Sequence, residues 1–290
     1  MAGFLGFFDY NKPGPGVNRD TPPKPRFQLF FELFFRKFWN LIKLNLLFFV
    51  FNIPAIAAAL FIAQFVMGNR TSGSALGDLY VLMVTAAVLV CIPIITLGPA
   101  QAGFTYVLRN YSREEHAFIW SDFKEHALRN LKQSLIIMAI DLVVTFVMCL
   151  DISVFAAIKD GGAVISFADA ILLILFVLYM IMHMYIYPML ITFELKVTQI
   201  YKNALIFALL KLFPNLLILA ICVLLVMISL FILPAGIILL PFITFSLIGF
   251  IINFHVNPIL KKYMIDKVHT APQNQEDKRR KKLTADVDRN

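Results

Sequence analysis

The sequence predicts an all-α fold: a polytopic membrane helix bundle of six transmembrane helices, arranged as three hairpins and preceded by interfacial elbow helices. Of its 290 residues, 60% are hydrophobic and 15% are charged, whereas soluble domains hold about 45–50% apolar and 25% charged residues. The apolar residues gather in stretches that match the roughly 20 residues of a membrane-crossing helix. Lysine and arginine gather in alternate connections between these stretches. Together the three observations exclude an ordinary soluble domain.

Two segments precede the first span. Residues 1–26 contain repeated prolines and glycines, which predicts an irregular cytoplasmic arm. In residues 27–43, polar side chains recur every three or four positions and aromatic side chains cover the other faces. The polar stripe consists of Gln28, Glu32, Arg36, Asn40 and Lys43. This pattern predicts an amphipathic interfacial helix in the headgroup layer, and a soluble helix packed on a partner is the alternative.

The membrane domain is predicted to occupy residues 44–268. Its six spans are expected at 44–67, 79–98, 133–158, 168–192, 204–230 and 233–256. Pro234 and Gly236 favour a tight hairpin between the last two spans, and a single kinked or re-entrant segment is the alternative. Residues 269–290 are polar with a basic centre, which predicts a disordered cytoplasmic tail drawn to anionic lipid.

The basic residues also orient the chain. All but Arg70 and Lys159 of the 26 lysines and arginines lie before the first span, in the second-to-third connection, in the fourth-to-fifth region (Lys196, Lys202 and Lys211) or after the sixth span. Connections rich in lysine and arginine stay in the cytoplasm, so both termini are predicted to be cytoplasmic. This distribution explains the net charge of +8 without a nucleic-acid partner, and the lipid bilayer is the expected surrounding.

Several polar residues interrupt the predicted spans. They are Asn52, Thr96, Asp141, His183 and Asn253. Ionisable groups inside a membrane are costly, so they suggest a functional site. We expect these residues at comparable depths, lining a cavity open to the cytoplasm with Asp141 and His183 as its charged pair. The alternative is a set of helix-packing hydrogen bonds in which a neighbouring hydroxyl or amide satisfies Asp141.

The connection between the second and third spans forms a second elbow. Ser112 and Asp122 are each followed three residues later by glutamate, a pattern typical of capping boxes. It predicts a short helix near 112–119 and a second helix from Asp122 into the third span. The candidate docking elbow for a cytoplasmic partner comprises Trp120, Asp122, Phe123 and Arg129. The alternative is a solvated loop whose polar residues only cap helices.

Three motifs carry a family resemblance. Residues 94–103 have the sequence Ile-Ile-Thr-Leu-Gly-Pro-Ala-Gln-Ala-Gly, Asp122-Phe123 follows, and residues 130–134 are Asn-Leu-Lys-Gln-Ser. The chain resembles, through these motifs, the YesL-like family of predicted bacterial integral membrane proteins, which is defined by a domain of unknown function. The resemblance implies a place in the bacterial cytoplasmic membrane and association with carbohydrate uptake. Sugar-importer subunits are the implied partners.

The sequence analysis leads to two hypotheses for the function. The first is a non-enzymatic accessory or assembly protein of a carbohydrate-uptake system, and the second is an independent small-solute transporter that uses the Asp141/His183 cavity. An enzyme is not predicted, because the sequence lacks paired carboxylates, an HExxH motif and a nucleophile–base constellation. No cofactor or metal is predicted either, since Cys91, Cys149 and Cys222 lie in apolar spans without metal-binding spacing.

Overall fold

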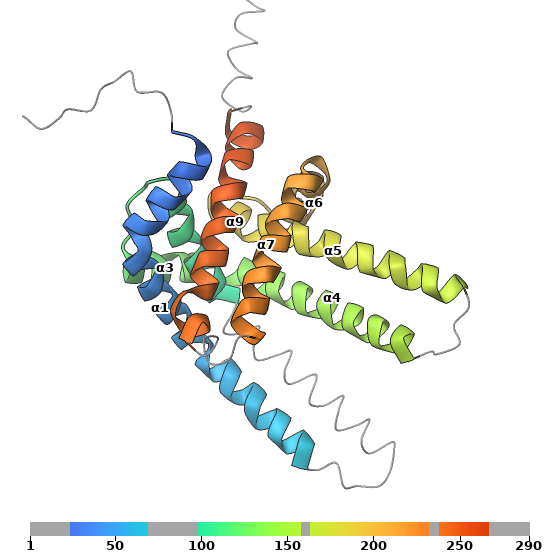
Figure 1. Ribbon diagram of the computed structural model, residues 1–290. Helices are drawn as coiled ribbons and strands as arrows, with labels where there is room; N and C mark the ends of the chain where they lie inside the picture. Colours follow the sequence, from blue (N-terminus) through green and yellow to red (C-terminus); the bar gives the residue numbers. More distant parts are fainter. Residues whose placement is uncertain (1–23, 69–97, 158–162, 232–237, 267–290) are drawn as a thin grey trace, which may run out of the picture.

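The computed structural model describes residues 24–68, 98–157, 163–231 and 238–266 (Figure 1). All regular secondary structure in these ranges is helical, as the sequence predicts. The α-helices are α1 (Arg26–Gly68), α3 (Ile119–Arg129), α4 (Leu131–Ala157), α5 (Ala163–Thr192), α6 (Val197–Leu210), α7 (Leu212–Phe231) and α9 (Phe245–Leu260). The π-helical segments η1 (Leu240–Thr244) and η2 (Lys261–Ile265) flank α9. A further helix occupies residues 98–112.

The helix α9 lies at the centre of the packing. α4 and α5 run side by side as a hairpin, and α5 also packs against α6 and α9 (Figure 1). α1 packs along η1 and α9. One buried apolar cluster joins α5, α6 and the C-terminal half of α9, and a second cluster joins α1, residues 98–112 and Phe250 of α9. Both clusters therefore depend on α9.

Helices long and apolar enough to cross a membrane are found in the described part of the chain at Ala170–Thr192, Leu212–Ser229 and Leu240–Ile265. They match the predicted fourth and sixth spans and most of the predicted fifth. The predicted first span lies inside α1, and the third lies within α4 except for its last residue. The predicted second span lies outside the described residues except for Gly98. The apolar helices indicate a membrane protein, and the count of six spans stays a prediction.

Other predicted segments also lie beyond the described ranges. The arm is described only from residue 24, and the tail 269–290 is outside the description. The predicted hairpin between the last two spans falls on residues 232–237, which are outside it as well. The two helices on either side of that hairpin, α7 and α9, do contact each other.

The interfacial helix and the first span form a single helix. α1 contains 43 residues and is therefore about 65 Å long. The predicted boundary between residues 43 and 44 has no break, because the sequence holds no glycine or proline from residue 27 to residue 53. The separate interfacial helix of the sequence prediction is thus the first part of α1.

The first part of α1 has three faces. Its buried face contains Leu33, Leu41 and Leu44, all 0% exposed. The polar stripe lies outside, as predicted. The aromatic residues lie on two different faces. Phe30 packs on Phe250 and Phe254 of α9. Four others, spaced four residues apart, are exposed. The exposed aromatic residues are Phe27, Phe31, Phe35 and Trp39.

The second elbow differs from its prediction in two ways. Residues 113–118 are not helical, so the predicted helix near 112–119 is wrong: the preceding helix ends at residue 112. It ends in a Schellman motif, in which Glu114 adopts a left-handed φ of 63° and the N–H of Glu115 donates to Asn110 O (2.8 Å). The second difference concerns the single helix predicted from Asp122 into the third span, because the structure has two helices there, α3 and α4. They separate at Asn130, whose backbone N–H (3.2 Å) and side-chain amide (2.9 Å) both donate to His126 O and end α3.

The predicted fifth span, 204–230, is likewise divided. α6 ends at Leu210 and α7 begins at Leu212. Pro214 has no N–H to donate to the carbonyl of Leu210, so a continuous helix would lose a hydrogen bond at this point. The side chain of Asn215 donates instead to the carbonyls at the end of α6.

Close backbone contacts explain the glycines of the 94–103 motif. A Cβ atom on Gly98 would lie 2.9 Å from the carbonyl oxygen of Ser134 on α4. A Cβ atom on Gly103 would overlap the carbonyl oxygen of Phe123 on α3. The motif that carries the resemblance therefore seats the helix 98–112 directly against the backbones of α3 and α4.

We expect Gly103→Ala to destabilise the protein by about 1–3 kcal/mol, because the added methyl group meets backbone that cannot rotate away. The measurement is thermal unfolding of the purified protein in detergent. Gly249→Ala is the matched control: it is also helical, but its Cβ would meet the side-chain ends of Leu108 and Phe104, which can move. Equal losses for the two variants would contradict this account of the motif.

Candidate functional site

The carboxylate of Asp141 joins three helices. Asp141 lies on α4 and is 6% exposed. Its Oδ1 accepts hydrogen bonds from the hydroxyls of Tyr179 on α5 (2.5 Å) and Tyr201 on α6 (2.7 Å). Its Oδ2 lies 2.9 Å from His183 Nε2 on α5, and this nitrogen donates, because a carboxylate oxygen accepts. The structure brings Asp141 and His183 together, as the cavity hypothesis expects, and supplies the neighbouring hydroxyls that the packing alternative expects.

A pocket of about 340 Å³ opens beside this cluster. It is lined by Gln101, Met138, Asp141, Leu142, Tyr179, Met180, His183 and Tyr187. The side chain of His183 is 38% exposed and that of Asp141 is 8% exposed, so the imidazole is the more accessible member of the pair. Tyr187 is buried, and its hydroxyl has no hydrogen-bond partner among the described residues.

Asn52 and Asn253 do not line this pocket. The amide of Asn52 donates to Phe48 O (2.6 Å), and the amide of Asn253 donates to Gly249 O (2.8 Å). Both side-chain carbonyl oxygens are buried without a partner in the described part of the chain. Thr96 lies outside the described residues. Within the described pocket, the five-residue cavity is thus reduced to Asp141 and His183, with tyrosines that the sequence analysis did not single out.

The four residues of the predicted docking elbow lie in different environments. Trp120 is 58% exposed and stacks on Phe51, with ring centroids 6.3 Å apart. Asp122 Oδ2 accepts from the backbone N–H of Phe118 (2.9 Å), so it caps the start of α3. Phe123 is 1% exposed and belongs to the apolar core, which removes it from any exposed docking surface. Arg129 is exposed and lies 3.7 Å from Glu194.

Asn215 connects four helices, and the sequence analysis did not single it out. It is 0% exposed. Its Oδ1 accepts from the Tyr185 hydroxyl on α5 (2.6 Å) and lies 2.9 Å from His255 Nε2 on α9, while its Nδ2 donates to Phe207 O and Ala208 O of α6. A single asparagine next to a proline in an otherwise apolar run was the available sequence signal.

Asn45 similarly connects α1 to η1 and to the start of α9. Its Nδ2 donates to the carbonyls of Leu240 (2.9 Å) and Pro241 (2.6 Å) in η1, and its Oδ1 accepts from the N–H of Ser246 (2.8 Å). A π-helix shifts the backbone hydrogen-bond pattern, so it presents carbonyls to a side chain of another helix. Asn45 thereby fixes α1 on the start of α9.

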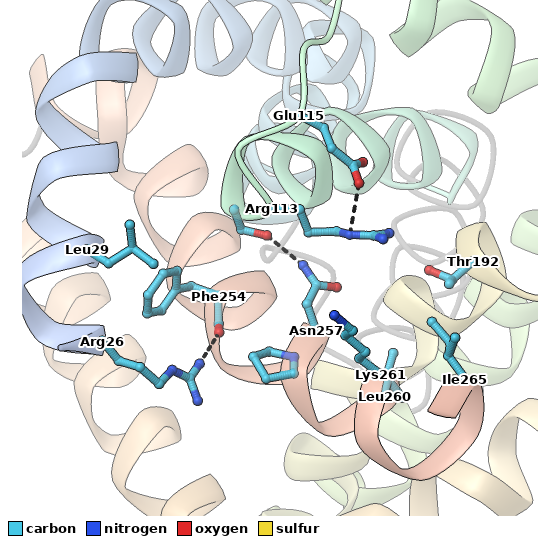
Figure 2. Close-up of a pocket in the computed structure, with 12 residues that line it drawn as sticks. Arg26, Leu29, Arg113, Glu115, Thr192, Phe254, Asn257, Leu260, Lys261 and Ile265 are labelled. Atoms are coloured by element: carbon cyan, nitrogen blue, oxygen red, sulfur yellow. Dashed lines mark hydrogen bonds and ion pairs between the residues drawn. The ribbon is translucent and has the colours of Figure 1, made fainter. Parts of the chain in front are cut away.

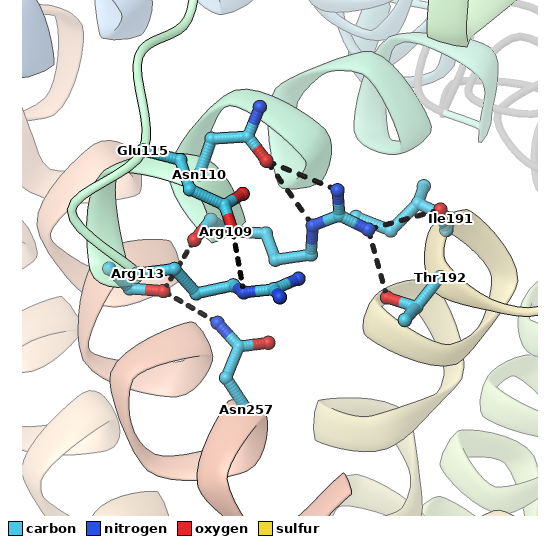
Figure 3. Close-up of polar contacts among 8 residues, drawn as sticks. Arg109, Asn110, Arg113, Glu115, Ile191, Thr192 and Asn257 are labelled. Carbon is cyan, nitrogen blue, oxygen red and sulfur yellow. Dashed lines mark hydrogen bonds and ion pairs between the residues drawn. The ribbon is translucent and has the colours of Figure 1, made fainter. Parts of the chain in front are cut away.

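Arg109 holds the end of α5 (Figure 3). Its Nη1 donates to Ile191 O (3.3 Å) and Thr192 Oγ1 (3.2 Å), and its Nε and Nη2 donate to Asn110 Oδ1. Burial lowers the pKa of Arg109 from its usual value, and the charge of Arg113 lowers it further. The three acceptor atoms of these four hydrogen bonds are neutral, so none of them neutralises the guanidinium charge.

A pocket of about 370 Å³ lies between the start of α1, the end of the helix 98–112 and the end of α9 (Figure 2). Arg26 Nη2 donates to Phe254 O (2.7 Å), a carbonyl that is free because Pro258, four residues later, has no N–H. Asn257 Nδ2 donates to Ser112 Oγ (2.5 Å). These polar groups hold α9 against its neighbours.

Residues 41–152 match the model of a family described as "Protein of unknown function, DUF624". The matched segment includes the later part of α1, the helix 98–112, α3 and most of α4. It contains Asp141 but not Tyr179, His183 or Tyr201, which lie beyond it. No curated protein and no solved structure matches the chain. Over this segment the chain is therefore similar to a family whose function is not established.

We expect Tyr201→Phe to lower the free energy of unfolding by about 1–3 kcal/mol, because it removes a hydrogen bond to a buried carboxylate. Thermal unfolding in detergent measures the change. Tyr187→Phe is the matched control, since the Tyr187 hydroxyl has no partner among the described residues and its loss is expected to be neutral. If Tyr187→Phe costs as much as Tyr201→Phe, the Asp141 cluster does not stabilise the helices.

Proposed function

We propose that the chain is a non-enzymatic integral membrane protein that acts as an accessory or assembly component of a bacterial carbohydrate-uptake system. In this proposal both termini are cytoplasmic and α3 is the docking element. The observation that carries it is the outward side of α3 and of the start of α4, where Trp120 and Leu128 of α3 and Leu131 of α4 are 58%, 59% and 43% exposed. Exposed tryptophan and leucine on a short surface helix are typical of a protein-binding patch.

The polar residues of the apolar helices favour the same function. Asp141, Asn45 and Asn215 each bond to groups on neighbouring helices, so their polar atoms serve helix packing. Exposed apolar side chains also lie on the short helix α3, outside the apolar helices of membrane length, and the inner face of α3 is anchored by Phe123. An anchored helix with an exposed apolar face suits a protein that binds another protein.

The link to carbohydrate uptake rests on the resemblance. The motifs at 94–103 and 130–134 resemble the YesL-like family, whose members are often associated with carbohydrate-uptake and glycan-use systems. The segment that matches the family of unknown function contains these motifs and all of α3. The resemblance and the docking face therefore concern the same part of the chain.

Affinity capture from native bacterial membranes in mild detergent tests the proposal. We expect the wild-type chain to recover the membrane subunits of a sugar importer, and Trp120→Ser combined with Leu128→Ser to lower that recovery at least about tenfold, a loss of roughly 1.4 kcal/mol or more in binding. Quantitative mass spectrometry of the captured proteins provides the measurement. Recovery of no transport subunit by the wild-type chain would count against the accessory function.

Phe213→Ser is the control for this experiment. Phe213 lies at the start of α7 and is 84% exposed, so its replacement also removes an exposed apolar side chain. We expect it to leave the recovery unchanged. Equal losses for Phe213→Ser and the α3 double variant would show that the loss does not depend on α3.

A second candidate function is favoured by the Asp141–His183 pair and its pocket. An ionisable pair at a pocket within apolar helices is the arrangement expected of a small-solute transporter coupled to protons. The 340 Å³ pocket lies within the range of small-molecule sites. We keep this function second, because two tyrosine hydroxyls already satisfy the carboxylate.

Transport is tested in reconstituted vesicles with labelled monosaccharides and a pH-sensitive dye. If the second function holds, Asp141→Asn abolishes solute or proton flux while expression stays intact, because the charge that pairs with His183 is gone. Asp151→Asn removes a carboxylate from the same helix and is expected to leave the flux unchanged. Unchanged flux in Asp141→Asn would exclude a transport function of this pair.

A further inference from the structure

A larger, basic pocket lies where α3, the start of α4 and the connection from α5 to α6 meet. Its volume is about 680 Å³, which is enough for a small organic ligand. Its cationic lining side chains are Arg109, Arg129, Lys132 and Lys196, and His126 lies beside them. The described lining contains a single carboxylate, that of Glu194.

The positive charge of this pocket is only partly compensated within the described residues, because Glu194 pairs with Arg129 and the negative charge of Glu115 acts on Arg109. Glu194 is 96% exposed and pairs at 3.7 Å with Arg129. Arg109 donates to neutral acceptors, as Figure 3 shows. Neither Lys132 nor Lys196 forms an ion pair in the described ranges. Four cations and one carboxylate in the described lining leave a net positive charge, so the pocket favours an anion.

The walls of the pocket are held in place. Gln133 Nε2 on α4 donates to Leu195 O (3.2 Å) and fixes the connection from α5 to α6. The ring of Tyr106 stacks on the ring of His126, with ring centroids 3.3 Å apart. The guanidinium carbon of Arg109 lies over the Tyr106 ring, 4.7 Å from its centroid. The guanidinium of Arg109 is therefore already held in position before a ligand binds, which lowers the entropic cost of binding one.

We propose that this pocket binds the phosphate group of a ligand, supplied either by a phosphorylated small molecule or by an anionic phospholipid headgroup. Because several cations are opposed by one carboxylate, the pocket favours an anion that carries up to two negative charges, such as a phosphate group, over a monoanion. Lysine suits phosphate as a mobile point charge, and Lys132 and Lys196 are the lining cations that form no ion pair among the described residues. Lys132 directly precedes the predicted span 133–158, a position from which lipid headgroups and soluble solutes are both accessible.

Two titrations separate the two sources. In nanodiscs of phosphatidylcholine alone, calorimetry with inorganic phosphate and glycerol 3-phosphate measures binding of a soluble phosphate. In nanodiscs that also contain phosphatidylglycerol, native mass spectrometry counts the phospholipid that stays bound. We expect Lys132→Gln combined with Lys196→Gln to weaken whichever binding occurs at least about tenfold, since each lysine contributes to a multivalent charge contact. Both lysines are exposed, so the fold should persist, and the melting temperature without ligand checks this.

The matched control is Lys124→Gln combined with Lys202→Gln, which removes exposed lysines from α3 and α6 that do not line the pocket. It should leave binding within about twofold. Binding of glycerol 3-phosphate or retention of phosphatidylglycerol, lost only in the pocket variant, supports the proposal and names the source. Absence of both, or equal losses in the two double variants, overturns it. Both measurements use the isolated protein, so they succeed or fail independently of any protein partner on α3.

Discussion

A polar group inside an apolar helix must find its hydrogen-bond partner within the protein, and the arrangement of the described helices depends on this constraint. The clearest case is Asp141, whose carboxylate accepts from two tyrosines and pairs with His183. The donors come from α5 and α6, so satisfying one carboxylate fixes the position of three helices. Apolar side chains have no comparable directional requirement in a membrane, because lipid can replace their contacts.

The same constraint acts on backbone carbonyls wherever a helix is interrupted. Pro258 frees the carbonyl of Phe254, and Arg26 binds it from α1. Pro214 prevents a continuous helix from α6 into α7, and the side chain of Asn215 bonds to the carbonyls at the break. The π-helical segment η1 presents two carbonyls to Asn45. Each of these irregularities in one helix thus leaves backbone carbonyls that accept hydrogen bonds from a side chain of another helix.

The two sites proposed for other molecules both lie around α3. Its outer face carries exposed apolar side chains, and its last residue, Arg129, lines the basic pocket. The helix 98–112 supports both features, because Gly103 contacts the backbone of α3 and Arg109 holds the end of α5. A protein partner on α3 and a phosphate in the pocket would therefore meet at Arg129, so an effect of one on the other would pass through that residue.

The sequence by itself determined what composition and periodicity control: an all-α chain, apolar helices of membrane length and the polar stripe of α1. It also led us to expect that Asp141 pairs with His183, as the structure shows. It also pointed to the 94–103 motif without giving the reason for its glycines. The tertiary structure decided the rest, because a side chain's partner depends on which helices pack together. Only packing shows that Phe123 is buried, that Tyr179 and Tyr201 approach Asp141, and that Asn52 and Asn253 bond to their own helices. The breaks at Asn130 and Lys211 were missed for a related reason: apolar periodicity continues across them, and the hydrogen bonds that end each helix are visible only in three dimensions.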